Sequence, residues 1–109
     1  MPTSVLSPLP SADLRRRFER LAGDWKKRSK FLSNTAQMAM LPAYQRIIGM
    51  GLPAVPLILE ELQRDPDQWF WALEAITEEN PVSPAEAGNV RGMAQCWIDW
   101  GRRQGLAAP

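Results

Sequence analysis

The sequence contains no histidine and only one cysteine, Cys96, among its 109 residues. Without histidine the chain cannot supply an imidazole base, an imidazole metal ligand or a cysteine–histidine pair. A single thiol can form neither an internal disulfide nor a zinc site built from several thiolates. We therefore interpret Cys96 as a small buried hydrophobic residue, and we expect no metal and no other cofactor.

Long apolar runs are also missing. The longest, residues 52–59, spans eight residues and contains two prolines, so no segment is suited to crossing a membrane. The first ten residues lack the basic and then apolar pattern of a signal peptide. We therefore expect a cytoplasmic protein without membrane contact.

The net charge is only +1, although the charges are unevenly distributed. Residues 1–30 hold eight Lys or Arg against three Asp or Glu, a balance of +5, whereas residues 60–79 hold one against seven, a balance of −6. The small sum disfavours a dedicated nucleic-acid-binding domain, which is usually strongly basic. The two opposite regions, however, favour association with a charged partner.

No segment shows sustained alternation of apolar and polar residues, so strands are not expected. The pattern instead predicts an all-α protein, a compact bundle of four to five helices. Residues 1–10 contain three prolines and no periodicity, and we predict a flexible leader there. The length suits one core, so we assign residues 11–105 to a single helical domain.

Caps, prolines and glycines place the helix ends. Residues 33–41 could hold a short helical turn or simply a bridge, and Gly51 suits the left-handed position that ends a helix. Ser83 and Glu86 form a capping-box pattern, with proline at the first helical position. Glycines 88, 92 and 101 are interpreted as close-packing points. The predicted helices run from Ser11 to about Ser29, from Pro42 to the Gly49-Met50-Gly51 turn, from Pro53 through Leu62, over residues 66–78, and from Ser83-Pro84 to about Arg103.

The middle of the chain, residues 43–76, reads as helix, glycine turn, proline-led helix, Asp-Pro turn and helix. This order resembles a HEAT-type helical repeat, in which each hairpin buries one face and offers the other to a neighbour. Only about one and a half repeats fit. The resemblance therefore implies a central HEAT-like hairpin rather than a full solenoid.

A more specific set of motifs covers residues 20–105 and resembles a family of small uncharacterised bacterial proteins. Members of that family have histidine before the PAYQ motif, where this chain has Leu41. The resemblance implies a two-gene or mobile-element-associated system, with an antitoxin, immunity or adaptor role and no enzymatic activity. The motifs are Trp25-Lys26, Pro42-Ala43-Tyr44-Gln45, Ile47-Ile48-Gly49-Met50-Gly51, Pro56-Leu57-Ile58-Leu59, Trp69-Phe70-Trp71-Ala72-Leu73, Asn80-Pro81-Val82, and Trp97 through Gly101.

An aromatic cluster is the first candidate site. On a helix Trp69 shares a face with apolar residues, whereas Trp71 lies about 200° away among polar ones. Trp71 could pack under the leader or another helix of the same chain. Alternatively, Trp71 with Phe70 at its flank could anchor a protein partner, because aromatic residues dominate binding hot spots. We favour a partner encoded nearby, and homo-oligomers are a further possibility.

The basic first helix is the second candidate site, with Arg16, Arg20 and Lys27 on one side. This side could be a solvated face, could steer an acidic partner or the acidic region of another copy, or could contact the phosphates of a nucleic acid. The alternative function is therefore a nucleic-acid-binding accessory protein.

The carboxylates of residues 60–79 show no spacing that isolates a catalytic pair or a Mg²⁺ or Ca²⁺ loop, and we interpret them as a solvated face. An enzyme acting through carboxylates and a metal is the weaker reading. The sequence thus favours a non-enzymatic protein–protein interaction subunit, with Trp71, Phe70, Arg16, Arg20 and Lys27 binding the partner.

Overall fold

The computed structural model describes residues 11–108 and is all-α over that part of the chain. The predicted leader, residues 1–10, lies outside the described residues. No strand occurs within residues 11–108, and the helices slightly exceed the four to five expected. They are α1 (Ala12–Ser29), α2 (Thr35–Met40), α3 (Pro42–Met50), α4 (Val55–Arg64), α5 (Phe70–Thr77) and α6 (Val90–Arg103), with 3₁₀ turns η1 (Leu52–Ala54) and η2 (Pro84–Glu86).

Helices α1, α3 and α4 begin and end close to the positions that their local signals predict. The Ser11 side chain caps α1 by accepting a hydrogen bond of 3.1 Å from the Leu14 amide. Pro42 occupies the first turn of α3, and Gly51 ends that helix with a φ of 73°. The segment 33–41, which was left open between a helical turn and a bridge, forms the separate helix α2 and is the one addition to the five predicted ranges.

Helix α5 begins four residues later than predicted, at Phe70 instead of Pro66. In a helix starting at residue 66, the Gln68 carbonyl would accept from the Ala72 amide. Here the Tyr44 hydroxyl stands between the two groups: it donates to the Gln68 oxygen and accepts from the Ala72 amide, each at 2.9 Å. A side chain from α3 therefore sets where α5 begins.

The last helix was also predicted to begin too early. The capping-box prediction at Ser83 is wrong, since that side chain makes no capping hydrogen bond and η2 replaces the first turn. Gly88 then turns the chain with a φ of 88°, and Asn89 caps α6 through the Gly92 amide. A helix starting at Pro84 would require helical dihedral angles at Gly88, and the positive φ of Gly88 excludes them. Gly88 is therefore a turn residue rather than a packing point.

The other two glycines of this region do lie where a side chain would collide. A Cβ at Gly101 would meet the Leu59 side chain of α4, and a Cβ at Gly92 would meet the Glu86 carboxylate. The prediction of close packing against another helix therefore holds for Gly101, whereas Gly92 meets only side chains of the adjoining turn, Glu86 and Asn89.

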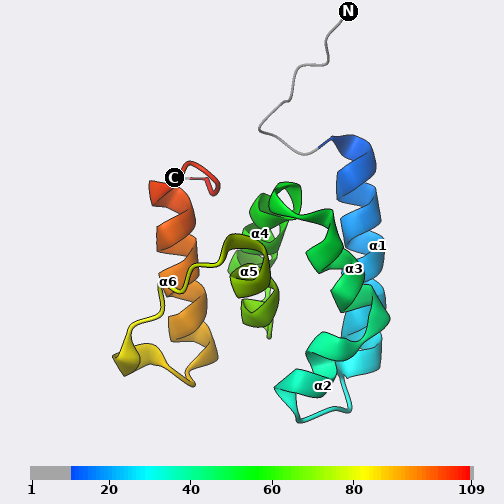
Figure 1. The fold of residues 1–109 in the computed structure, drawn as a ribbon, viewed down its shortest axis with the longest axis horizontal. Coiled ribbons are helices and arrows are strands. Elements are labelled where there is room, and N and C mark those ends of the chain that lie inside the picture. The colour runs from blue at the N-terminus through cyan, green and yellow to red at the C-terminus, as the bar shows by residue number, and fades with distance from the viewer. Residues whose placement is uncertain (1–10, 109) are drawn as a thin grey trace, which may run out of the picture.

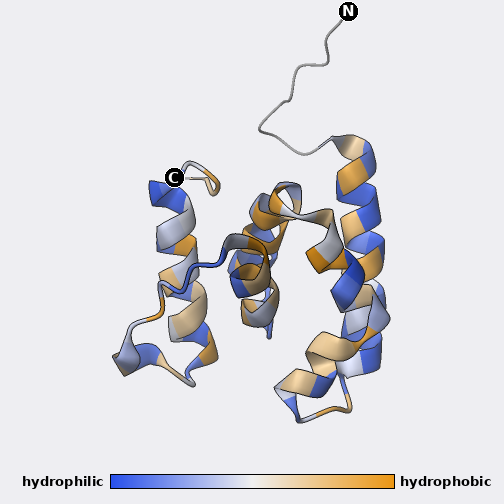
Figure 2. Cartoon of the chain, in the orientation of Figure 1, coloured by the Kyte–Doolittle hydropathy of each residue, from blue (hydrophilic) through white to orange (hydrophobic). Residues whose placement is uncertain are grey.

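Figure 1 shows the helices side by side, with α1 at one edge, α3 next to it, α4 and α5 in the middle and α6 at the other edge. Helix α3 packs against α1 and α5, and α4 packs against α6. Apolar segments of the central helices, orange in Figure 2, belong to one continuous core. Between residues 11 and 108, no helix has the length and apolarity required to cross a membrane.

Aromatic rings from α1 and α3 meet Trp69, the residue just before α5, in this core. The Trp69 ring lies 4.4 Å from Trp25 and 5.7 Å from Tyr44, measured between ring centroids, and stacks nearly parallel to Tyr44. Phe18 of α1 lies 5.9 Å from the same indole. Aromatic contacts at these separations stabilise a fold beyond the area they bury, so this cluster fixes α5 against α1 and α3.

Candidate functional site

The tryptophans divide sharply by exposure. Three are fully buried, Trp25, Trp69 and Trp97, and Trp100 is nearly so. Trp71 is 46% exposed, although it lies only two residues from Trp69. Within the described part of the chain, Trp71 is therefore the tryptophan of the Trp69-Phe70-Trp71 motif that stays about half exposed.

Helical geometry explains the outward position of Trp71. Ala72 and Leu73 on α5 are fully buried and face the core, whereas Glu74 and Ala75 are exposed on the side that Trp71 shares. Successive residues advance by about 100° around an α-helix, so Trp71 cannot lie on the same face as Leu73. Packing of the inner face thus holds the indole toward the outside.

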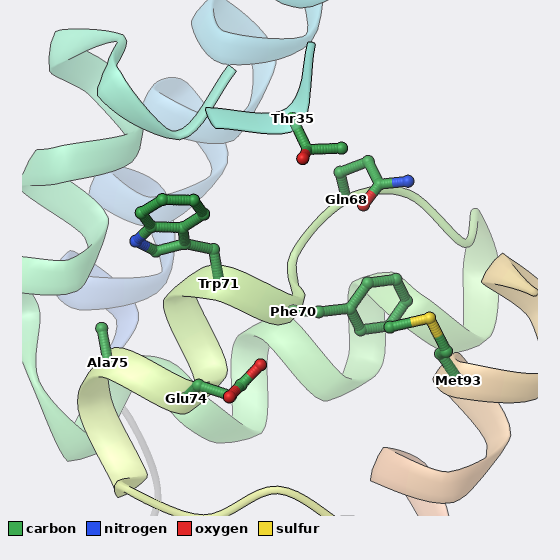
Figure 3. A pocket seen from close by; sticks show the side chains of 7 residues that line it. All are labelled: Thr35, Gln68, Phe70, Trp71, Glu74, Ala75 and Met93. Carbon is green, nitrogen blue, oxygen red and sulfur yellow. The ribbon is translucent and has the colours of Figure 1, made fainter. Parts of the chain in front are cut away.

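A pocket of about 510 Å³ opens beside Trp71. Its walls come from three parts of the chain: the start of α2, the segment leading into α5 with α5 itself, and α6. Figure 3 shows the Trp71 indole and the Phe70 ring on different sides of this pocket, with Phe70 directed toward Met93. The lining residues are Thr35, Gln68, Phe70, Trp71, Glu74, Ala75 and Met93.

Phe70 has a different role from Trp71. Its side chain is only 4% exposed, so it forms a wall of the pocket and not a protruding anchor. Sequence reasoning paired the two rings by adjacency, but it did not find Thr35 or Met93. Those residues line the pocket from α2 and α6, which are distant from Trp71 in the sequence, so no local pattern signals them.

The pocket is acidic. Glu74 is its only charged lining residue. The surrounding segment, residues 65–90, contains six Asp or Glu and no Lys or Arg. Of these acids only Asp65 forms an ion pair within residues 11–108, with Lys26. The Glu74 carboxylate beside Trp71 therefore has no ion-pair partner in the described part of the chain.

Two cations of the basic first helix, Arg15 and Lys26, form ion pairs with acids in and just after α4. Arg15 donates to Glu60 at 2.7 Å, and Lys26 contacts Glu61 at 2.5 Å and Asp65 at 2.8 Å. These pairs join α1 to α4 and its C-terminal end. The acidic region, which the sequence analysis interpreted as a solvated face and also considered as a contact for α1 of another copy, thus partly neutralises α1 within the molecule.

The three predicted steering residues lie outside the pocket, since none of its lining residues belongs to α1. Arg16 pairs with Asp13 on the helix surface. Arg20 and Lys27 are exposed and form no ion pair within the described chain. Arg16, Arg20 and Lys27 therefore do not share one site with Trp71, and their binding role stays a prediction.

Glu61 is the carboxylate that sequence reasoning missed, because it was interpreted as part of a solvated face. It is only 6% exposed and accepts hydrogen bonds from Lys26 and Arg64. Burial alone raises the pKa of Glu61, but the hydrogen bonds and charges of Lys26 and Arg64 outweigh burial and hold that pKa below its ordinary value. Glu61 therefore stays ionised as a structural link between α1 and α4.

A second exposed aromatic residue, Phe31, lies in the turn after α1 and is 86% exposed. The Lys30 ammonium lies 5.5 Å from the centre of its ring. Phe31 lines none of the pocket beside Trp71. It therefore provides an internal control for the effect of an exposed aromatic side chain as such.

Within residues 11–108, no cluster of three or more His, Cys, Asp or Glu residues could hold a metal ion. No protein-family model, curated protein or solved structure matches this chain. The family and HEAT-like resemblances therefore stay predictions.

Proposed function

We propose that this protein is a non-enzymatic interaction subunit, of the antitoxin, immunity or adaptor type, that binds a partner protein in the cytoplasm. Trp71 anchors the contact, and Phe70 with Met93 forms the apolar wall beside it. The single observation that supports the proposal is the 46% exposure of an indole that lines a pocket of about 510 Å³.

Binding at this place has a clear energetic basis. A partner that covers Trp71 removes a large apolar surface from water, which is favourable by roughly 25 cal/mol per Å². The buried face of α5 holds the helix in place, so little ordering cost accompanies association at Trp71. Truncating a central, rigid tryptophan at an interface commonly weakens binding by about 2 kcal/mol or more.

Nucleic-acid binding by α1 receives less support. Four of its cations, Arg15, Arg16, Lys26 and Arg28, form ion pairs within the chain. A phosphate would have to compete with these carboxylates for each of the four. Three exposed cations of α1, Arg17, Arg20 and Lys27, form no ion pair within residues 11–108 and would be left for phosphate contacts.

The test is co-purification of the partner with the tagged full-length protein from cells that carry its gene. Wild type, Trp71→Ala and Phe31→Ala are compared, with the bound protein identified by mass spectrometry. We expect Trp71→Ala to weaken recovery or affinity at least tenfold, since about 2 kcal/mol exceeds one factor of ten. Phe31→Ala should retain the partner.

Circular dichroism of all three proteins establishes that they are folded. Full retention of the partner by a folded Trp71→Ala protein would remove the proposed anchor. Equal losses for both aromatic variants would show that the contact is non-specific.

A further inference from the structure

The chemistry of the Trp71 pocket is more specific than that of an apolar groove. Aromatic and apolar groups form its walls, Gln68 and Thr35 add polar atoms that can accept hydrogen bonds, and Glu74 supplies one carboxylate. Glu74 makes no ion pair or side-chain hydrogen bond with any residue in 11–108. An aromatic face and an unpaired carboxylate therefore line the same pocket.

Charge decides which kind of group suits this pocket. No cation lines it, and Arg64 and Arg91 are the nearest basic residues in sequence on either side of the acidic segment 65–90. Glu78 and Glu79, at the end of α5, are further exposed carboxylates of this segment. An anionic or purely apolar ligand would leave these carboxylates uncompensated, whereas a cationic group is attracted to both the carboxylate and the ring quadrupole.

We propose that the pocket receives an arginine side chain of the partner protein, stacked on the Trp71 indole and hydrogen-bonded to the Glu74 carboxylate. This inference rests on the proposed function and specifies the chemistry of the partner. A planar guanidinium can stack on an aromatic face and donate to a carboxylate at the same time, and it is less strongly hydrated than an ammonium group. Arginine is therefore favoured over lysine.

A second copy of this chain is a less suitable source of that arginine. The exposed arginines of α1 belong to a surface that does not line the pocket, so such a contact would join two different faces. Contacts of this heterologous kind close into rings only for particular rotations and otherwise grow into open chains. A separate protein with a basic segment avoids this geometric requirement.

The experiment uses the full-length protein labelled with ¹⁵N and two short peptides, acetyl-Gly-Arg-Gly-amide and acetyl-Gly-citrulline-Gly-amide. Citrulline has nearly the shape of arginine without the charge. Trp71→Phe identifies the Trp71 indole signal by its loss. We expect the arginine peptide to shift that signal in a saturable way, and the citrulline peptide to shift it little at equal concentration.

Variants make the result specific. Glu74→Gln should weaken binding of the arginine peptide about fivefold, as expected for the loss of one exposed charged pair. Added salt should weaken binding of the peptide to the wild-type protein as well. Glu79→Gln, an exposed acid outside the pocket lining, should change the affinity less. No saturable shift at Trp71, equal responses to arginine and citrulline, or unchanged binding by Glu74→Gln would each overturn the inference.

The arginine contact can fail while the proposed function holds. If Trp71→Ala loses the partner but no arginine response is found, the interaction subunit stands and the arginine contact fails. Light scattering tests the remaining source: self-association that Trp71→Ala and Arg20→Gln both abolish would assign the pocket to a second copy and overturn the inference of a separate partner.

Discussion

Trp69 and Trp71 are the same residue type two positions apart, yet their environments are opposite. Trp69 is fully buried against Trp25 and Tyr44, whereas Trp71 is 46% exposed beside an acidic pocket. One indole therefore contributes to folding, and the other contributes surface that folding leaves uncovered. The α5 segment thus presents one large side chain to the core and leaves another half exposed on its outer face.

The acidic residues repeat this contrast. Glu61 is buried and paired with Lys26 and Arg64, while Glu74 is exposed and unpaired within residues 11–108. Burying a carboxylate without a partner is costly, so a buried acid in a stable fold comes with cations. An exposed acid needs none, and it remains available to a ligand.

The largest expected effect separates the two tryptophans. Trp69→Ala removes a fully buried indole and should lower the free energy of unfolding by about 3–5 kcal/mol. Trp71→Ala removes a half-exposed one and should cost less than about 1 kcal/mol. Urea unfolding followed by circular dichroism measures both. Equal losses of stability would mean that Trp71 is a core residue like Trp69.

A smaller effect concerns the hydroxyl that starts α5. Tyr44→Phe keeps the ring but leaves the Gln68 carbonyl and the Ala72 amide without their partner, which should cost about 1–3 kcal/mol. Amide hydrogen exchange at Ala72 should accelerate more than at Met93, whose amide donates to Asn89 within α6. Unchanged protection at Ala72 would show that the helix begins independently of Tyr44.

The smallest effect depends on pH and tests the difference between the paired Glu61 and the unpaired Glu74. The pKa of Glu61 is lowered in the folded state from 4.5, so its ion pairs stabilise the fold above that pH and the contribution is lost as the pH falls through the lowered value. Glu61→Gln should therefore be less stable than wild type by about 1–2 kcal/mol at pH 7, with the gap closing in acid.

Glu74→Gln is the matched control for this measurement, because the same substitution is made at an exposed acid. It should change the free energy of unfolding by less than about 0.5 kcal/mol at either pH. Urea unfolding at neutral and acidic pH gives both differences. A Glu61→Gln gap that does not narrow in acid would mean that the lost stability comes from packing and not from charge.

Local signals predicted much of this molecule. Ser11, Pro42 and Gly51 act on amides and dihedral angles within their own turn, so their effects can be derived from a few neighbouring residues. The rotation of 100° per residue likewise placed Trp71 opposite Leu73 before any packing was known.

Two local signals competed for the start of α6, and the sequence alone did not decide between them. The Ser83–Glu86 pattern and Asn89 both offered a helix start, and Asn89 is the residue that caps α6. The difference lies in Gly88, whose positive φ turns the chain between them. Both signals are worth similar small energies, so the packing of the segment decides between them.

The sequence by itself therefore determined the all-α class, the caps of the early helices and the outward face of α5, because each depends on residues one or two turns apart. Only the tertiary structure decided the start of α5, the pairing of Glu61 and the walls of the Trp71 pocket. Their partners, Tyr44, Lys26 and Met93, are far away in the chain, and contacts of that range form only when the whole core packs.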